Sequence, residues 1–169
     1  MVVLRILGID PGSRVTGFGF IDVLGNHYKH VAHGTVRLPP KTPLTTRLHK
    51  IFTDISEVID TYRPDCVAVE QVFVSKNVQS ALVLGQARGA AICAVSQHNP
   101  EIAEYTATQI KQALVGAGHA DKSQIQYMVS MLLNLPKNPP QDAADALACA
   151  LCHAQHQSWQ KATSVRARQ

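Results

Sequence analysis

Four acidic residues stand where they could together hold divalent metal ions: Asp10, Glu70, Asp142 and Asp145. Asp10 and Glu70 each follow directly on an apolar run, so each is expected at the C-terminal end of a buried strand. Asp142 and Asp145 are three residues apart where a helix should begin, which puts their Cβ atoms about 5–6 Å apart on one helix face. If the two strands are parallel neighbours, Asp10 and Glu70 emerge at one sheet edge, the usual place for a site in open α/β folds.

Carboxylates brought this close repel each other, and without a counter-ion some of them must take up protons at neutral pH. Divalent cations remove the conflict, and an all-oxygen ligand set favours Mg²⁺ or Mn²⁺ over zinc. Two such ions about 4 Å apart can activate a water molecule and stabilise the leaving oxygen in an in-line attack on a phosphodiester. The acids therefore predict metal-dependent phosphodiester hydrolysis.

Each acid also has a purely structural explanation. An Asp before Pro-Gly is commonly a turn residue, as Asp10 is in its sequence context. Asp142 and Asp145 would interact favourably with the dipole of a helix that starts beside them. Glu70 is harder to explain in this way, because a charge at the end of a buried strand must be neutralised. The hypothesis of a metal site rests on the convergence of all four.

The elements that must position these acids follow from apolar periodicity and from turn residues. The expected strands are 3–9, 16–23, 27–37, 66–69 and 101–106, with a hairpin turn at Gly25-Asn26. The expected helices run from Leu44 to the stop at Arg63-Pro64, then over 77–97, 108–115, 122–135 and about 140–156. Gly85 and Gly89 share one face of the second helix and would allow close helix packing.

Three hairpin-linked strands followed by crossover helices predict an α/β fold with a five-stranded mixed sheet and helices on both faces. We expect a single domain over residues 1–157. Residues 158–169 form a basic C-terminal tail, which we expect to be flexible.

Composition narrows the class of protein. A hydrophobic fraction of 46% and a charged fraction of 17% are ordinary for a folded chain. The N-terminal sequence does not resemble a signal peptide, and no uninterrupted apolar run approaches the roughly 18 residues of a membrane span, so we expect a cytoplasmic protein. The four cysteines, Cys66, Cys93, Cys149 and Cys152, lie in apolar segments and are expected to be reduced core residues.

The charge distribution is compatible with a phosphate-bearing partner. The formal net charge is +4, of which the tail carries three charges through Lys161, Arg166 and Arg168. Residues 1–157 then carry +1, and setting the four acids aside leaves +5 for the rest of that surface. A mildly basic protein without such a partner fits the charge equally well.

At these acids the sequence resembles the RuvC family of Holliday junction resolvases, which belong to the ribonuclease H-like nucleases. The resemblance spans residues 4 to about 153 and is carried by four segments in the order and spacing of the family: Gly8-Ile9-Asp10-Pro11-Gly12-Ser13 with Thr16-Gly17, Glu70-Gln71-Val72-Phe73, Gly85-Gln86-Ala87-Arg88-Gly89, and Asp142-Ala143-Ala144-Asp145-Ala146-Leu147-Ala148.

The resemblance implies a ribonuclease H-like fold and a homodimer that nicks a four-way DNA junction symmetrically, one strand per subunit. It implies two Mg²⁺ ions per subunit, for which Mn²⁺ can substitute, and ligatable nicks with 5′-phosphate and 3′-hydroxyl ends. Asp10, Glu70, Asp142 and Asp145 match the four catalytic acids and metal ligands of the family. A branch-migration motor complex (RuvA and RuvB) is implied as a partner, although no segment identifies its docking surface.

Five further residues are candidates for DNA binding: Phe73, Lys76, Arg88, Lys111 and Lys122. Phe73 matches the aromatic that the family inserts near the junction centre, where stacking on an unpaired base contributes about 1–3 kcal/mol; alternatively it folds back onto the core. Lys111 and Lys122 match basic positions beside the site and could neutralise charge on the phosphate, although either could be a solvated surface lysine. Position alone suggests that Lys76 and Arg88 contact backbone phosphates.

The last helix also contains Cys149-Ala150-Leu151-Cys152-His153, which spells a haem attachment motif, followed by His156. Haem attachment needs export, and one helix face cannot easily surround a tetrahedral zinc ion with four of its own side chains. We therefore expect Cys149 and Cys152 to pack against the sheet, and His153 and His156 to lie near the C-terminal end of the helix.

Two other functions remain open. An actin-like or chaperone-type phosphotransfer protein shares the core fold, but it needs two such domains and a second phosphate loop, which 169 residues do not accommodate. A non-catalytic junction-binding module would gain nothing from four acids facing DNA phosphates.

Overall fold

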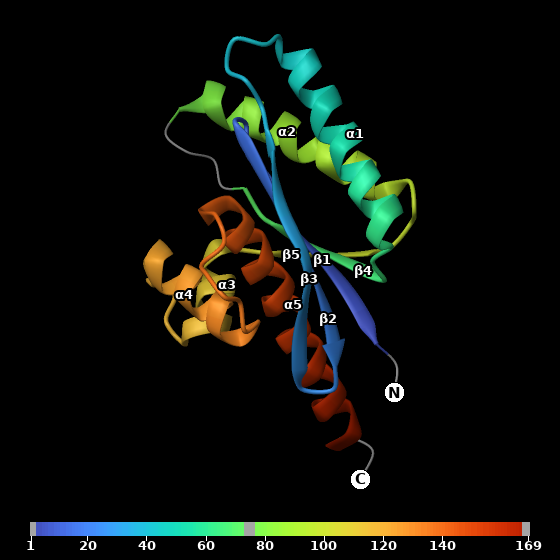
Figure 1. The fold of residues 1–169 in the computed structure, drawn as a ribbon, viewed down its shortest axis with the longest axis vertical. Helices are drawn as coiled ribbons and strands as arrows, with labels where there is room; N and C mark the ends of the chain where they lie inside the picture. The colour runs from blue at the N-terminus through green and yellow to red at the C-terminus, as the bar shows by residue number, and fades with distance from the viewer. Residues whose placement is uncertain (1–2, 73–76, 167–169) are drawn as a thin grey trace.

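The computed structural model describes the backbone of residues 3–72 and 77–166, with side chains up to residue 158. It confirms the expected α/β fold, a five-stranded mixed sheet with helices on both faces (Figure 1). The strands are β1 (Leu4–Asp10), β2 (Val15–Leu24), β3 (His27–Arg37), β4 (Cys66–Glu70) and β5 (Glu101–Tyr105). The helices are α1 (Leu44–Tyr62), α2 (Val78–Ser96), α3 (Ala107–Val115), α4 (Lys122–Leu132) and α5 (Gln141–Arg166).

The strand order β3-β2-β1-β4-β5 places β1 and β4 side by side at the centre. The hairpin-linked strands β1, β2 and β3 pair antiparallel, whereas β1 with β4 and β4 with β5 pair parallel. Parallel pairing brings the C-terminal ends of β1 and β4 to the same edge of the sheet, as the sequence predicted for Asp10 and Glu70.

The sheet separates two apolar cores. On one face, α1 and α2 cover side chains such as Leu7 and Phe20, and α1 contributes the buried stripe that contains Ile51 and Ile55. On the other face, α3, α4 and α5 form a second layer whose centre includes Leu147 of α5. Figure 1 shows α5 running along the sheet, with α3 and α4 beside it.

Helix α5 packs unusually close to the strands because glycines replace side chains beneath it. A Cβ atom on Gly8 of β1 would lie 1.9 Å from the backbone oxygen of Ala146, and one on Gly17 of β2 would lie 1.9 Å from the backbone oxygen of Asp142. Only a residue without a Cβ fits at either position. The glycines therefore set the depth at which the start of α5 meets the C-terminal end of β1.

Helix α5 continues to Arg166, past the end that the sequence suggested near residue 156. The segment after residue 141 contains no glycine or proline, so nothing in the local sequence stops the helix. Consequently His153 and His156 both lie well inside α5, and their predicted place near the helix end was wrong; His153 is also buried.

The cysteines are all free thiols, as expected, but they do not all lie in the core. Cys66, Cys149 and Cys152 are buried, which confirms the predicted packing of the last two, whereas Cys93 on α2 is exposed. Burial raises the pKa of the Cys66 and Cys152 thiols to about 12. Cys93 differs because it lies on the face of α2 that points away from α1 and the sheet.

Helix α2 is apolar yet little buried. By length and composition it could cross a membrane, but only 22% of that window is buried in the fold, and a single helix of this kind is weak evidence for a membrane span. Its exposed residues include no charge, and six of them recur at helical spacing along one face: Val78, Leu82, Gly85, Gln86, Gly89 and Cys93. An uncharged helix face of this size is a surface available for a protein partner.

Candidate active site

Three of the four predicted acids meet in one cavity. Asp10, Glu70 and Asp145 line a space of about 220 Å³ together with Lys111 of α3 and Lys122 of α4. Ala107, Ile110 and Ile125 supply apolar walls. The cavity thus lies at the C-terminal edge of β1 and β4, between the sheet and the second helical layer.

The register of the central strands explains this arrangement. Ile9 of β1 pairs with Val69 of β4, so the residues that follow them, Asp10 and Glu70, emerge side by side. Asp10 itself pairs with Gly17 of β2, whose Cα is in close contact with the backbone of Asp142. The first turn of α5 is therefore held against the end of β1, and Asp145 follows one turn later.

Burial and mutual repulsion dominate the electrostatics of the acids. Burial raises the pKa of Asp10, and the charges of Glu70, Asp145 and Asp142 raise it further, while Lys122 lowers it. Burial likewise raises the pKa of Glu70, followed by the charge of Asp145. A hydrogen bond between the Asp10 and Glu70 side chains then lowers the Glu70 pKa, as does the neighbouring Lys111. The cavity thus carries negative charge that two lysines only partly offset.

Asp142 takes a different position from the other three acids. It is half-buried and does not line the cavity, although its charge raises the pKa values of both Asp10 and Asp145. Across the described part of the chain, no three carboxylate, imidazole or thiolate groups surround a single point closely enough to enclose a metal ion. The acids share a cavity without forming a closed coordination shell.

The predicted DNA-binding residues separate into three groups. Lys111 and Lys122 line the carboxylate cavity, at the place where the sequence expected them. Arg88 instead forms an ion pair with Glu104 of β5, with 2.5 Å between Nη2 and Oε1, so its guanidinium is engaged within the fold. Phe73 and Lys76 lie outside the described residues.

Two polar contacts near the site were not identified from the sequence. The Thr16 hydroxyl is fully buried and bonds with both the backbone N–H and the carbonyl of Gly12, which closes the turn after Asp10. The Tyr105 hydroxyl lies 2.8 Å from Nδ1 of the buried His153, which joins the end of β5 to α5. The sequence shows that Tyr105 ends a strand and that His153 lies on an apolar helix, but neither residue indicates that the other is its partner.

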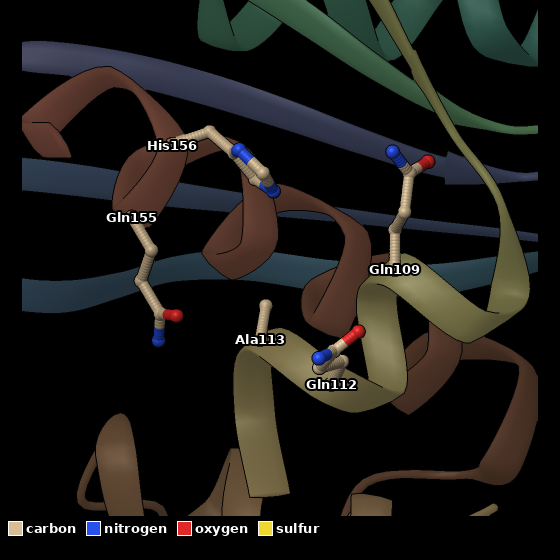
Figure 2. A pocket seen from close by; sticks show the side chains of 5 residues that line it. All are labelled: Gln109, Gln112, Ala113, Gln155 and His156. Atoms are coloured by element: carbon tan, nitrogen blue, oxygen red, sulfur yellow. The ribbon is translucent and has the colours of Figure 1, made fainter. Parts of the chain in front are cut away.

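A larger cavity of about 490 Å³ lies elsewhere, between α3 and α5. Figure 2 shows Gln109, Gln112 and Ala113 on α3 facing Gln155 and His156 on α5. Among the described residues, no carboxylate lines this space, and the residues of α3 that line it differ from those at the acids. Its chemistry does not suit a divalent metal, so the smaller carboxylate cavity is the candidate active site.

Comparisons with known proteins identify the family of the chain. The family profile described as crossover junction endodeoxyribonuclease RuvC matches residues 6–153. A crossover junction endodeoxyribonuclease RuvC from Magnetococcus marinus is 55% identical over 160 residues, which are 95% of this chain and 89% of that protein. One from Geobacter sulfurreducens is 56% identical over 151 residues, which are 89% of this chain and 92% of that protein.

A solved structure has a similar fold. T. thermophilus RuvC in complex with a Holliday junction substrate matches with a TM-score of 0.87 at 34% sequence identity, covering 93% of this chain and 96% of that one. The span that the family profile matches includes all four acids. The chain therefore belongs to the RuvC family of crossover junction endodeoxyribonucleases.

Proposed function

We propose that this chain cuts DNA at four-way junctions by metal-dependent phosphodiester hydrolysis, with Asp10, Glu70, Asp142 and Asp145 as the metal ligands. The observation that carries the proposal is the single cavity shared by Asp10, Glu70 and Asp145 beside Lys111 and Lys122. Membership of a nuclease family sets the phosphotransfer alternative aside. The retained acids argue against a module that only binds.

The acids fit a divalent cation by their chemistry. Their donors are all oxygen, which suits Mg²⁺ or Mn²⁺. The raised pKa values of Asp10 and Glu70 reflect negative charge held in a buried place without enough positive charge nearby, and a cation would relieve that conflict. We infer two Mg²⁺ ions per subunit; when bound, such ions lower the pKa of a water molecule and stabilise the leaving oxygen.

Other residues near the acids would contribute to catalysis and to DNA binding. The cavity walls formed by Ala107, Ile110 and Ile125 exclude bulk water beside the acids, which strengthens electrostatic interactions there. Lys111 and Lys122 offer positive charge at the phosphate while charge builds on its oxygens. Membership of the family leads us to expect nicks with 5′-phosphate and 3′-hydroxyl ends. Phe73 would stack on a base near the junction centre, and Lys76 would contact the backbone.

Symmetric cleavage requires a second active site, and we propose that the chain forms a homodimer. The uncharged exposed face of α2 supports this, since Val78 is 66% and Leu82 is 59% exposed there. A Cβ atom on Gly85 or Gly89 would meet nothing within 4 Å, so a second helix could approach closely. Leu82→Glu should shift sedimentation velocity towards the monomer, whereas an unchanged dimer would exclude this face.

Other expectations follow from the family. A DNA substrate places the enzyme in the cytoplasm, and a branch-migration motor complex (RuvA and RuvB) would supply the junction. Arg88 is a weaker candidate for a phosphate contact than the lysines, because Glu104 already occupies it.

A labelled four-way junction tests the central proposal. The wild-type protein should make paired symmetric nicks with Mg²⁺, none without a divalent ion, and none on a linear duplex of the same sequence. Asp10→Asn should abolish nicking while junction binding persists. Junction binding by the wild-type protein without any Mg²⁺-dependent nicking would instead favour the non-catalytic module.

A further inference from the structure

A second group of cations lies at the same edge of the sheet as the acids but on the other side of Asp10 from Lys111 and Lys122. We call it the flanking basic surface and define it by Arg14, Arg37, Lys41 and Arg47. Arg14 lies in the turn between β1 and β2, Arg37 ends β3, and Lys41 lies in the connection to α1. Figure 1 shows this connection and the start of α1 at the top of the view, with α3 and α4 lower, beside α5.

Backbone and side-chain contacts hold this surface together. Arg47, in the first turn of α1, donates from Nη1 to the carbonyl of Ser13 over 3.2 Å. The backbone N–H of Leu38 donates to the carbonyl of Arg14 over 2.8 Å, and Arg37 pairs in register with Val15. The turn that follows Asp10 is thus joined to both β3 and α1.

The charge of this surface is not balanced within the described part of the chain. None of its four cations forms an ion pair with a described residue, and residues 23–53 contain no Asp or Glu. Nε of Arg47 is buried and has no hydrogen-bond partner among the described atoms. The buried Nε is not itself within reach of a ligand, but Arg14, Arg37 and Lys41 are exposed, and a cluster of exposed cations without acidic partners favours an anionic ligand from outside the fold.

Given the proposed function, we infer that the flanking basic surface binds phosphates of the cleaved strand on one side of the cut, while Lys111 and Lys122 act at and beyond the other side. In the sheet order β3-β2-β1-β4-β5, Arg37 lies two strands from Asp10 and two residues farther along β3 than Thr35, which is level with Asp10, so the two are about 12 Å apart. That distance corresponds to about three to four nucleotides of rise along a DNA strand. The two basic groups would hold the strand across the carboxylates and so present one phosphodiester to the metal ions.

Salt dependence of junction binding, measured by fluorescence anisotropy without divalent ions, tests the surface. Arg14→Ala combined with Arg37→Ala should weaken binding and lower the slope of log K against log salt by about 0.9 for each lost phosphate contact. Lys29→Ala is the matched control, because Lys29 is also exposed on β3 but pairs with Asp22 at the opposite end of the sheet. A slope equal to that of Lys29→Ala would overturn the inference.

Neutral methylphosphonates placed singly on either side of the cut locate the contacts. In single-turnover cleavage, neutralising a phosphate on one side of the cut should no longer slow the Arg14→Ala/Arg37→Ala variant, although neutralising one on the other side still should. For Lys111→Ala the two sides should be exchanged. If both variants lost their sensitivity to the same phosphates, the two basic groups would not contact opposite sides of the cut, and the inference would be contradicted. Arg47→Gln should also lower the salt slope; a loss of thermal stability with an unchanged slope would limit Arg47 to holding the turn.

These results separate the inference from the proposed function. If the wild-type protein and Lys29→Ala nick the junction with Mg²⁺, the proposed nuclease function is supported, whatever the result for the arginine variants. If the wild-type protein does not nick, the proposed function fails, and the salt slopes still show whether the surface binds DNA.

Discussion

Gly17 and Asp142 are in direct contact: a Cβ atom on Gly17 would lie 1.9 Å from the backbone oxygen of Asp142. Gly17 is the register partner of Asp10 on the neighbouring strand. A glycine on β2 therefore determines how close the acids of α5 come to the acid of β1, although it is 125 residues from Asp142 in the sequence.

Gly17→Ala should consequently reduce cleavage more than it reduces stability. The added methyl must push α5 away from β1, because its nearest neighbour is backbone, and overpacking of this kind costs about 1–3 kcal/mol of unfolding free energy. A small shift of Asp142 and Asp145 is enough to lower kcat by about 100-fold. Urea unfolding and single-turnover cleavage measure the two effects.

Gly85→Ala is the control for that substitution. Gly85 lies on α2 with open space around it, and alanine favours a helix interior by about 1 kcal/mol. Its monomer stability should be unchanged or higher. Wild-type cleavage by Gly17→Ala would show that the close approach of α5 does not set the site geometry.

The metal-free protein should lose stability as pH rises from the ordinary carboxyl range through the raised pKa values of Glu70 and Asp10, about 7 and about 8. Burial and like charges raise the pKa of Asp10 to about 8 and that of Glu70 to about 7, far above the ordinary carboxyl range. Between the ordinary and the raised pKa values the folded state binds more protons than the unfolded state, so unfolding becomes easier as pH increases. The slope is up to about 1.4 kcal/mol per pH unit for each proton difference.

The slope is obtained from the unfolding free energies of the metal-free protein at about pH 7 and about pH 8.5. This range lies above the pKa of ordinary histidines, so their titration contributes little. Asp10→Asn removes one of the repelling charges and should flatten the slope. Mg²⁺ should stabilise the wild-type protein more than Asp10→Asn. A metal-free wild type that becomes more stable over this range would contradict the crowding of the carboxylates.

Tyr105→Phe should destabilise the fold through its effect on His153. The hydroxyl removed lies 2.8 Å from Nδ1 of the buried imidazole, and a buried polar atom left without its partner costs about 1–3 kcal/mol. Tyr127→Phe is the matched control, since Tyr127 is 59% exposed and should change stability little. Equal midpoints in chemical unfolding for the two variants would mean that the Tyr105 contact contributes no net stability.

Phe73→Ala should impair junction resolution more than junction binding. Stacking of an aromatic on one unpaired base contributes about 1–3 kcal/mol, which is a small part of an interface dominated by phosphate contacts. Gel mobility shift without metal and single-turnover nicking with metal separate the two effects. Proportional losses in both assays would indicate that Phe73 only packs against the protein.

Much of the secondary structure could be predicted because its signals are local. The stripe of Ile51 and Ile55 defined α1, and the apolar run before Glu70 defined a strand buried on both faces. The end of α5 could not be predicted in this way, because no residue after 156 stops a helix and the local sequence therefore gives no end point. The exposure of Cys93 was missed for a related reason: apolar neighbours along the chain do not determine which helix face is covered.

By itself the sequence determined the types of group at the site and their places on elements: acids at the ends of two strands and at the start of a helix, with lysines on the helices between. Only the tertiary structure decided that Asp10, Glu70 and Asp145 share a cavity while Asp142 lies beside it, and that Arg88 pairs with Glu104. Local propensity depends on neighbours along the chain, whereas these distances depend on strand order and on how deeply α5 settles onto Gly8 and Gly17.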